Sequence, residues 1–411
     1  MEDIKQTWNQ TARQLFEEFK FVLNNVGVGI SANEYDRLQV PGRPDRRTLE
    51  RHTGLSWNQL KDLVYEESRT DPSTFEAIVR RNEQLRRELA KARDLRQAFI
   101  DNCITAVMNC SFKPAKIPPK QKSQENLECH AIRSDLHVGS KIIPEETEGL
   151  GHYDVETYEK RTERWLHKMV LFRDQDKTSL GLNKLVLNYL GDIVEGESIY
   201  PGQAFALDSF LFDQYRVAVQ TEINAILTLA GHFPSIEIFC VPGNHGRVGK
   251  KGEHHRTTNF DLFFYDMIKE RLKSQENVKV YFSKSPSMIV QHGTKTFLLN
   301  HGDNARGWMG IPYYSLERMF RRLPDLYGML IDYELCAHHH QPANLAGKIY
   351  MNGSMVGGSD LSIHKMGLTN IPSQKIFYFH HKFGINRESD LQLADPVKLT
   401  PDSAGIFTPH E

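Results

Sequence analysis

The sequence of 411 residues predicts an α/β domain that follows an all-helical N-terminal region. From about residue 127 onward, short apolar runs alternate with longer segments of helical periodicity, which is the pattern of an α/β protein. Several of the apolar runs end in clusters of Asp, Asn and His, and seventeen of the eighteen histidines lie beyond residue 126. The composition, 39% hydrophobic and 25% charged, is that of a globular chain and excludes a largely disordered one.

Residues 1–70 predict a small helical region. Between Arg47 and Val64, leucines flank a turn at Gly54, and Ser56 is placed to cap the second helix. This pattern is similar to a helix-turn-helix, although a lone match of this kind is a weak indication. A small helical core with an ordinary turn is the alternative, so DNA binding by this region stays open.

A long basic helix is expected over residues 71–110, because Asp71 and Pro72 form a typical helix start. Between residues 80 and 96 its polar face carries seven Arg and Lys side chains against three acidic ones. A solvated face with ion pairs one turn apart explains this charge. A basic arm near nucleic acid, or a dimerisation helix, is the alternative.

The Pro- and Lys-rich residues 111–126 predict a linker, and residues 127–385 form the expected α/β domain. Its expected buried strands are Leu127–Ile132, Lys184–Leu190, Ile236–Val241, Thr296–Leu299, Tyr333–Ala337, Lys348–Met351 and Lys375–Phe379. Its expected helices are Val155–Phe172, Phe205–Ala230 and Asn259–Leu272. Residues 386–411 contain three prolines and predict a loose C-terminal tail.

Charge and cysteine content exclude several classes of protein. With 51 Lys and Arg against 52 Asp and Glu, the net charge of -1 excludes a uniformly basic nucleic-acid binder but not a local basic patch. The five cysteines form no CxxC pair, so we expect reduced thiols in a cytoplasmic protein. The N-terminus lacks the features of a signal peptide, and no apolar stretch is long enough to span a membrane.

Polar residues follow five of the expected strands at their carboxyl ends, which is where α/β sheets place their sites. The segments are Ser134-Asp135-Leu136-His137, Gly191-Asp192-Ile193-Val194-Glu195, Pro242-Gly243-Asn244-His245-Gly246-Arg247, Asn300-His301-Gly302-Asp303 and His338-His339-His340. Each segment alone is weak evidence, but five at successive strand ends are hard to assign to chance. A mixed oxygen and nitrogen set without cysteine suits Mn, Fe, Zn or Co, and it is large enough for two metals that share a carboxylate.

The order D-x-H, G-D, G-N-H, H and H-x-H resembles the calcineurin-like metallophosphoesterase superfamily over about residues 127–380. The G-N-H-G-R form, together with Asn259-Phe260-Asp261 and Asn352-Gly353-Ser354, looks most like phage- and prophage-encoded members related to Mre11/SbcD-type DNA repair nucleases. The resemblance implies a four-layer α-β-β-α sandwich, preceded in this chain by the all-helical region.

The resemblance also implies a centre with two divalent metal ions, with Mn²⁺ expected and Fe, Zn, Co or Mg as alternatives. The implied ligands are Asp135, His137 and His340 for the first metal, Asn244, His301 and His338 for the second, and Asp192 as the bridge. His245 is implied as the general acid beside the metals. Many members carry Asp or Glu where this chain has Gly246, so the partner of His245 is open, with Asp303 as a candidate.

The implied activity is phosphodiester hydrolysis, with DNA as the expected substrate. Arg247, Lys250 and Lys251 lie on a basic segment after the third motif, and Arg306 follows the fourth, so all four are candidate phosphate contacts. Surface salt bridges are the alternative for the arginines. Aromatic and basic residues interleave over residues 306–322, which suits either stacking on unpaired bases or an ordinary amphipathic helix.

Two other functions stay open on the sequence. One is a phosphomonoesterase or small-nucleotide phosphodiesterase, since no segment is an unmistakable nucleic-acid domain. The other is a non-catalytic, metal-stabilised scaffold, which the presence of every implied ligand and of His245 disfavours. The resemblance to nucleases that dimerise further implies a homodimer through the N-terminal helices.

Overall fold

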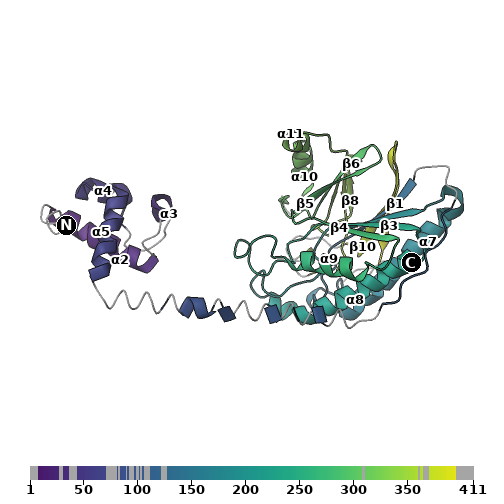
Figure 1. Cartoon of the computed structure of the whole chain (residues 1–411), viewed down its shortest axis with the longest axis horizontal. Helices are drawn as coiled ribbons and strands as arrows, with labels where there is room; N and C mark the ends of the chain where they lie inside the picture. The colour runs from purple at the N-terminus through teal and green to yellow at the C-terminus, as the bar shows by residue number, and fades with distance from the viewer. Residues whose placement is uncertain are drawn as a thin grey trace, which may run out of the picture. The chain divides into compact units, whose positions relative to one another are not determined.

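The computed structural model describes residues 8–26, 31–36, 44–70, 112–121, 127–307, 311–359, 362–363 and 370–394, with isolated helical positions between 81 and 105 (Figure 1). The chain divides into two compact units, residues 1–98 and residues 99–411, which are considered separately. Most of the long helix expected over residues 71–110 lies outside the described residues, as do residues 395–411 of the expected tail.

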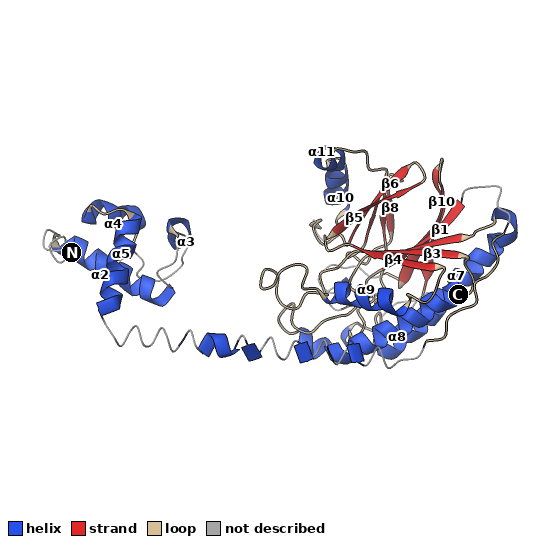
Figure 2. Cartoon of the chain, viewed as in Figure 1, coloured by secondary structure: helices blue, strands red, loops and turns tan. Residues whose placement is uncertain are grey.

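The regular structure among the described residues of the first unit is helical, as the sequence predicts (Figure 2). Its helices are α2 (Gln10–Val26), α3 (Ala32–Asp36), α4 (Arg46–Thr53) and α5 (Trp57–Thr70). They enclose a core rich in aromatic rings, in which Phe19 contacts Tyr35 and Trp57 with ring centroids 5.5 and 5.4 Å apart. Edge-to-face contacts of this kind add about 0.5–1.5 kcal/mol to the apolar burial of each pair.

The expected turn between α4 and α5 is present. Gly54 ends α4 in the left-handed region, with φ at 71°, and its N–H donates to the carbonyl of Glu50. The backbone N–H and the hydroxyl of Ser56 both donate to the Gln59 side chain, at 2.9 and 2.8 Å. The first of these bonds is one half of a capping box, so α5 begins where the sequence predicts.

The second unit contains two β-sheets. The first sheet has the order β11-β10-β1-β2-β3-β4, in which β1 to β4 run parallel and β10 is antiparallel to β1. Its strands are β1 (Leu127–Arg133), β2 (Lys184–Tyr189), β3 (Ser235–Cys240), β4 (Val278–Phe282), β10 (Ser373–His380) and β11 (Gly384–Gln392). One large core cluster joins this sheet to α7 (Val155–Leu180), α8 (Leu211–Ala230) and α9 (Phe260–Arg271).

The second sheet has the order β5-β6-β7-β9-β8. Its strands are β5 (Ser287–His292), β6 (Lys295–Asn300), β7 (Tyr333–Cys336), β8 (Ala343–Leu345) and β9 (Ile349–Met351). Phe297 on β6 packs against the first sheet, whereas the next residue, Leu298, packs outward with Leu323. Leu323 belongs to α11 (Leu323–Tyr327), which with α10 (Tyr313–Phe320) covers the outer face. Each sheet is thus covered by helices on its outer face, and together they form the expected four-layer α-β-β-α sandwich (Figure 2).

All seven expected strands and three expected helices are present, with ends shifted by up to eight residues. Four strands were not expected: β4, β5, β8 and β11. The boundary of the predicted tail at residue 386 needs correction, because β11 runs to Gln392 and pairs with β10 along its length. β11 is a polar edge strand, so it lacks the apolar run by which buried strands are recognised.

The sequence predicts reduced cysteines and no membrane-spanning segment. Cys129, Cys240 and Cys336 are free thiols, and all three are buried. Within the part of the chain that the structure describes, no helix combines the length and the apolar character needed to cross a bilayer.

A buried ion pair anchors the carboxyl end of β1. The Arg133 guanidinium donates to both oxygens of Glu222 on α8, at 3.1 and 2.5 Å, and both side chains are fully buried. The hydroxyls of Tyr158 and Tyr189 also donate to this carboxylate, each at 2.7 Å. The pair therefore joins β1, β2, α7 and α8 immediately before Asp135.

Glu334 on β7 is a buried carboxyl with incomplete hydrogen bonding. It accepts one bond from the Asn300 side chain at 2.6 Å. Its other oxygen, and the side-chain oxygen of Asn300, have no hydrogen-bond partner among the described residues. Burial raises the pKa of Glu334 from an ordinary 4.5 to about 7. Since the pKa is raised, the contribution of Glu334 to the stability of the fold is greatest below about pH 4.5 and is lost as pH rises through 7.

We expect Glu334→Gln to stabilise the protein at pH 8 by on the order of 1–3 kcal/mol, because it removes a buried charge and adds a donor for Asn300. Urea unfolding at pH 8 and pH 5 measures this effect, and the difference from wild type should shrink at the lower pH. The exposed Glu270→Gln on α9 is the control. Equal stability of wild type and Glu334→Gln at pH 8 would contradict the assigned pKa.

Candidate metal centre

The residues implied as metal ligands converge on one edge of the sandwich. They follow the carboxyl ends of β1, β2 and β3 in the first sheet and of β6 and β7 in the second, and they are Asp135, His137, Asp192, Asn244, His301, His338 and His340. Four are buried, and the other three, Asn244, His338 and His340, are half-buried. Each predicted ligand is therefore within the same region of the fold.

Asp135, His137 and His340 form the first group. Nε2 of His137 lies 3.1 Å from Nε2 of His340, which lies 3.4 Å from the Asp135 carboxylate. The ligand atoms of the three residues are all within 4.8 Å of one another. The histidines come from different sheets, so this group depends on how the two sheets pack.

Asp192, Asn244, His301 and His338 form the second group. Nε2 of His301 lies 2.9 Å from the Asp192 carboxylate and 3.1 Å from the Asn244 side-chain oxygen. Nδ1 of His338 lies 3.2 Å from the same His301 nitrogen. Asp192 is also 3.9 Å from Nε2 of His137, so its carboxylate lies between the two groups.

The backbone is strained at five of the seven implied ligands. Among the described residues, seven that are not glycine have a positive φ in the left-handed region. Five of them are implied ligands: Asp135 (51°), His137 (44°), Asp192 (56°), His338 (70°) and His340 (57°). Such conformations cost about 1–3 kcal/mol each and concentrate at functional sites. The fold therefore holds these side chains in place at a cost in stability.

The hydrogen bonds of two histidines fit metal ligation. Nδ1 of His301 lies 2.7 Å from the carbonyl of Leu190, and Nδ1 of His137 lies 2.8 Å from the Glu195 carboxylate. When these nitrogens carry the proton, Nε2 of each ring presents a lone pair to the centre, as in metal sites with an outer hydrogen-bonded shell. The donor set of carboxylate, amide oxygen and imidazole therefore fits divalent cations such as Mn²⁺, Fe²⁺ or Zn²⁺.

The pKa values of the histidines and of Asp192 reflect the close contact of buried carboxylates and imidazoles in this centre. Burial alone would lower the pKa of His301, but the adjacent Asp192 raises it to about 10. Burial lowers the pKa of His338 to about 3, and the positive charge of His301 adds to this effect. Asp192 itself has a pKa well below its ordinary value, because the surrounding histidines outweigh its burial. A cation at this position would replace the proton that His301 otherwise holds.

Asp261, at the start of α9, positions the bridging segment. Its carboxylate accepts from the backbone N–H of Asp192 (3.0 Å), Ile193 (3.1 Å) and Gly243 (2.8 Å). Burial, together with the charge of Asp192, raises its pKa to about 6. The sequence marked Asp261 only as part of a family-like segment, because the three N–H groups it binds are distant in the chain.

Gly243 leaves no room for a side chain. A Cβ at this position would lie 2.2 Å from Oδ1 of Asp192 and 2.4 Å from its backbone nitrogen. The loop after β3 therefore needs glycine to reach the loop after β2.

Glu195 is the carboxylate partner of His245, a question that the sequence left open. Nδ1 of His245 lies 2.9 Å from the backbone carbonyl of Glu195 and 3.4 Å from its carboxylate. Asp303, the candidate suggested from the sequence, instead accepts a hydrogen bond from Arg247 at 3.0 Å. Against the effect of burial, the charges of Glu195 and Asp192 raise the pKa of His245 to about 9.

The four candidate phosphate contacts occupy different surroundings. Arg247 is half-buried and paired with Asp303, which agrees with the salt-bridge alternative. Lys250 and Lys251 are exposed on the loop between β3 and α9, and Arg306 is exposed after the His301 segment. In the interleaved aromatic segment, Tyr314 is exposed on α10, and residue 308 lies outside the described residues.

Comparisons with known proteins give limited matches. No family model matches the chain. It is 29% identical over 186 residues to the DNA polymerase II small subunit of Pyrococcus horikoshii, which covers 44% of this chain and 25% of that protein. The corresponding subunit of Pyrococcus furiosus is 29% identical over 171 residues, covering 41% of this chain and 23% of that protein. The match thus spans about a quarter of each curated relative.

Among solved structures, the chain matches a conserved uncharacterized protein from Streptococcus pneumoniae TIGR4, described as a predicted phosphoesterase. The identity is 12%, with 64% of this chain and 98% of that chain covered, and the TM-score is 0.21. That score is too low to bear on the fold or the function. The similarity to the polymerase subunits supports the superfamily resemblance, but not the finer resemblance to phage-encoded or repair nucleases.

We expect Asp261→Asn to lower the free energy of unfolding by about 1–3 kcal/mol, because one of the two oxygens that accept backbone N–H bonds becomes a donor. Chemical denaturation measures the change, and the exposed Asp266→Asn on the same helix is the matched control. Unchanged stability in Asp261→Asn would show that these hydrogen bonds do not hold the loops.

Proposed function

We propose that the chain is a metal-dependent phosphodiester hydrolase that acts on DNA. The observation that carries this proposal is the convergence of seven oxygen and nitrogen ligands in two groups, with the Asp192 carboxylate between them. A centre of this kind suits chemistry on phosphate esters, since phosphate brings negative charge that two cations neutralise.

The side chains divide into two sets of ligands and one shared carboxylate. Asp135, His137 and His340 would hold one cation, Asn244, His301 and His338 the other, and Asp192 would contact both. Bound divalent cations supply Lewis acidity and lower the pKa of water so that hydroxide forms near neutral pH. The ligand set does not select among Mn²⁺, Fe²⁺, Co²⁺ and Zn²⁺, and Mn²⁺ is our choice.

His245 is the proposed general acid. Its backbone N–H donates to Asp192 at 2.7 Å, which holds the residue beside the centre. The negative charge of Glu195 and Asp192 favours the imidazolium, the form that donates a proton to a departing oxygen. With Nδ1 held by Glu195, Nε2 is the nitrogen that remains to carry that proton. His245 also lies within ligand distance of His137 and Asp192, so metal binding is the competing role.

Two observations support DNA as the substrate. The relatives that the chain resembles over about 44% of its length are named as subunits of a DNA polymerase. The loop that carries Asn244 and His245 continues into the exposed Lys250 and Lys251. Exposed lysines beside a phosphate-directed centre favour a polyanion over a small ester. A nucleotide phosphodiesterase or phosphomonoesterase is the second candidate, because the centre itself is common to both chemistries.

We expect Mn²⁺-dependent cleavage of DNA that is faster than hydrolysis of nucleotides or of p-nitrophenyl phosphate. Asp192→Asn should lower the rate at least about 100-fold, because it weakens the ligand shared by both groups. Activity on single- and double-stranded DNA, with and without chelator, measures this, and Asp266→Asn is the control. Rapid turnover of small substrates without DNA cleavage would favour the second candidate, and metal binding without any hydrolysis would favour a scaffold.

We expect His245→Ala to lower kcat by about 10²–10⁴-fold without loss of bound metal, because it removes a proton donor and no ligand. Glu195→Gln should lower kcat by about 10–100-fold, since it alters the groups that orient both His137 and His245. The exposed His254→Ala on the same loop is the control. Steady-state kinetics with metal analysis decides, and loss of metal from His245→Ala would make His245 a ligand.

A further inference from the structure

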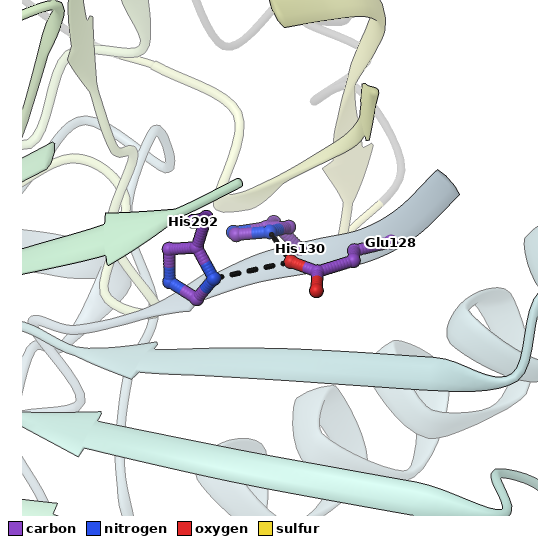
Figure 3. A group of neighbouring side chains, drawn as sticks. All are labelled: Glu128, His130 and His292. Carbon is purple, nitrogen blue, oxygen red and sulfur yellow. Dashed lines mark hydrogen bonds and ion pairs between the residues drawn. The ribbon is translucent and has the colours of Figure 1, made fainter. Parts of the chain in front are cut away.

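A second group of histidines surrounds a carboxylate at the other end of β1. Glu128 and His130 lie on β1, His292 is the last residue of β5, and His381 follows the last residue of β10. Figure 3 shows one oxygen of the Glu128 carboxylate in contact with the rings of both His130 and His292. The group thus draws on both sheets of the sandwich.

The distances in this group are close to those between ligands of a single metal ion. One Glu128 oxygen lies 3.1 Å from Nε2 of His130 and 3.1 Å from Nδ1 of His292. The other oxygen lies 2.9 Å from Nε2 of His381. Adjacent ligands around a tetrahedral Zn²⁺ with bonds of about 2.0–2.1 Å lie roughly 3.3 Å apart. The ligand atoms of Glu128, His130 and His292 are all within 4.8 Å of one another.

The surroundings make this group unlike a surface cluster. The relative exposures of Glu128, His130 and His292 are 4%, 0% and 5%. His130 stacks on Phe297 and Phe377, with ring centroids 5.6 and 5.0 Å apart. Buried polar groups in such an apolar setting need full hydrogen bonding or a metal.

Hydrogen bonding does not satisfy all of these nitrogens. Nε2 of His381 is buried and has no hydrogen-bond partner among the described residues, although Glu128 is only 2.9 Å away. The separation is that of a hydrogen bond, but the direction is not. The His381 nitrogen and the Glu128 oxygen therefore lie close together without a hydrogen bond, as two ligands of one cation do.

We propose that Glu128, His130, His292 and His381 form a structural site for a divalent transition metal, with Zn²⁺ as the best match. His381, whose Nε2 lies 2.9 Å from the Glu128 carboxylate but outside the group formed by the other three residues, would have to move toward His130 and His292 to complete a four-coordinate set. The metal would tie β1 and the end of β10 in the first sheet to β5 in the second. His381 is 36% exposed, which gives the metal a route from solvent.

One neighbour competes with the metal for Glu128. Nζ of Lys184 lies 2.9 Å from a Glu128 oxygen, and its positive charge would repel a cation. The same ammonium lies 2.8 Å from the Glu237 carboxylate, so it keeps a partner when Glu128 turns to the metal. The alternative to a metal is a network in which Lys184 and a protonated histidine neutralise Glu128.

The site is independent of the candidate metal centre. Glu128 precedes Asp135 by seven residues of mostly extended chain, which is about 23 Å at 3.3 Å per residue. The two groups share no residue. The two proposals can therefore fail separately: a lack of hydrolase activity would not contradict this site, and a lack of metal at this site would not contradict the hydrolase.

We expect the full-length chain, loaded with Zn²⁺ and freed of excess metal, to lose about one equivalent of zinc in both His292→Ala and His381→Ala. Elemental analysis measures the content, and Co²⁺ substitution should give the visible absorption of a tetrahedral site that these variants lack. His380→Ala is the matched control, because His380 is the adjacent histidine and its ring stacks on Phe383. Asp192→Asn should retain this equivalent.

Stability provides the second measurement. Chelation should lower the unfolding temperature of wild type and His380→Ala, but much less that of His381→Ala, which removes a partly exposed ligand and leaves the core intact. If His381→Ala and His292→Ala bind as much Zn²⁺ and Co²⁺ as wild type, the proposal is wrong. If chelation lowers the unfolding temperature of wild type and of His381→Ala by the same amount, the metal-free network is favoured and the proposal is wrong.

Discussion

The α/β unit depends on one constraint: the buried Asp192 carboxylate needs positive charge beside it. This group sits between two sets of histidines, at 2.9 Å from His301 and 3.9 Å from His137. An unpaired carboxylate in such a place would be very costly, so its surroundings must supply positive charge. The raised pKa values of His301 and His245 favour protonated rings that supply this charge, and metal cations would supply it in the proposed enzyme. The same demand explains why so many ligands meet here.

The rest of the unit supports that arrangement from outside. Asp261 binds backbone N–H groups of the bridging loop after β2 and of the loop after β3, and Gly243 allows these two loops to approach each other. The Arg133–Glu222 pair fixes the strand that leads into Asp135. These interactions offset the left-handed backbone at the ligands, which is a local cost that the remaining fold must carry. The proposed zinc site would strengthen the sandwich at the opposite end of the same strand.

Much of the candidate centre could be predicted from the sequence, because its ligands follow buried strands and the carboxyl ends of those strands meet at one edge. Glu195 and Asp261 lie in segments that the sequence singled out, but their roles could not be predicted. Glu195 and Asp261 act through contacts with His245 and with distant N–H groups, which depend on how loops fold together. Likewise, His292 ends a strand that the sequence did not indicate, since β5 is short and only partly buried. Its approach to Glu128 depends on the packing of one sheet on the other.

The most direct test of the account is a crystal structure of the protein grown with Mn²⁺, with the metals located by anomalous scattering. We predict two peaks about 3.5–4 Å apart, one on each side of the Asp192 carboxylate. One peak should contact Asp135, and the other should contact Asn244. An Asp192 carboxylate that remains bound to a protonated His301, with no metal beside it at saturating Mn²⁺, would contradict the central claim.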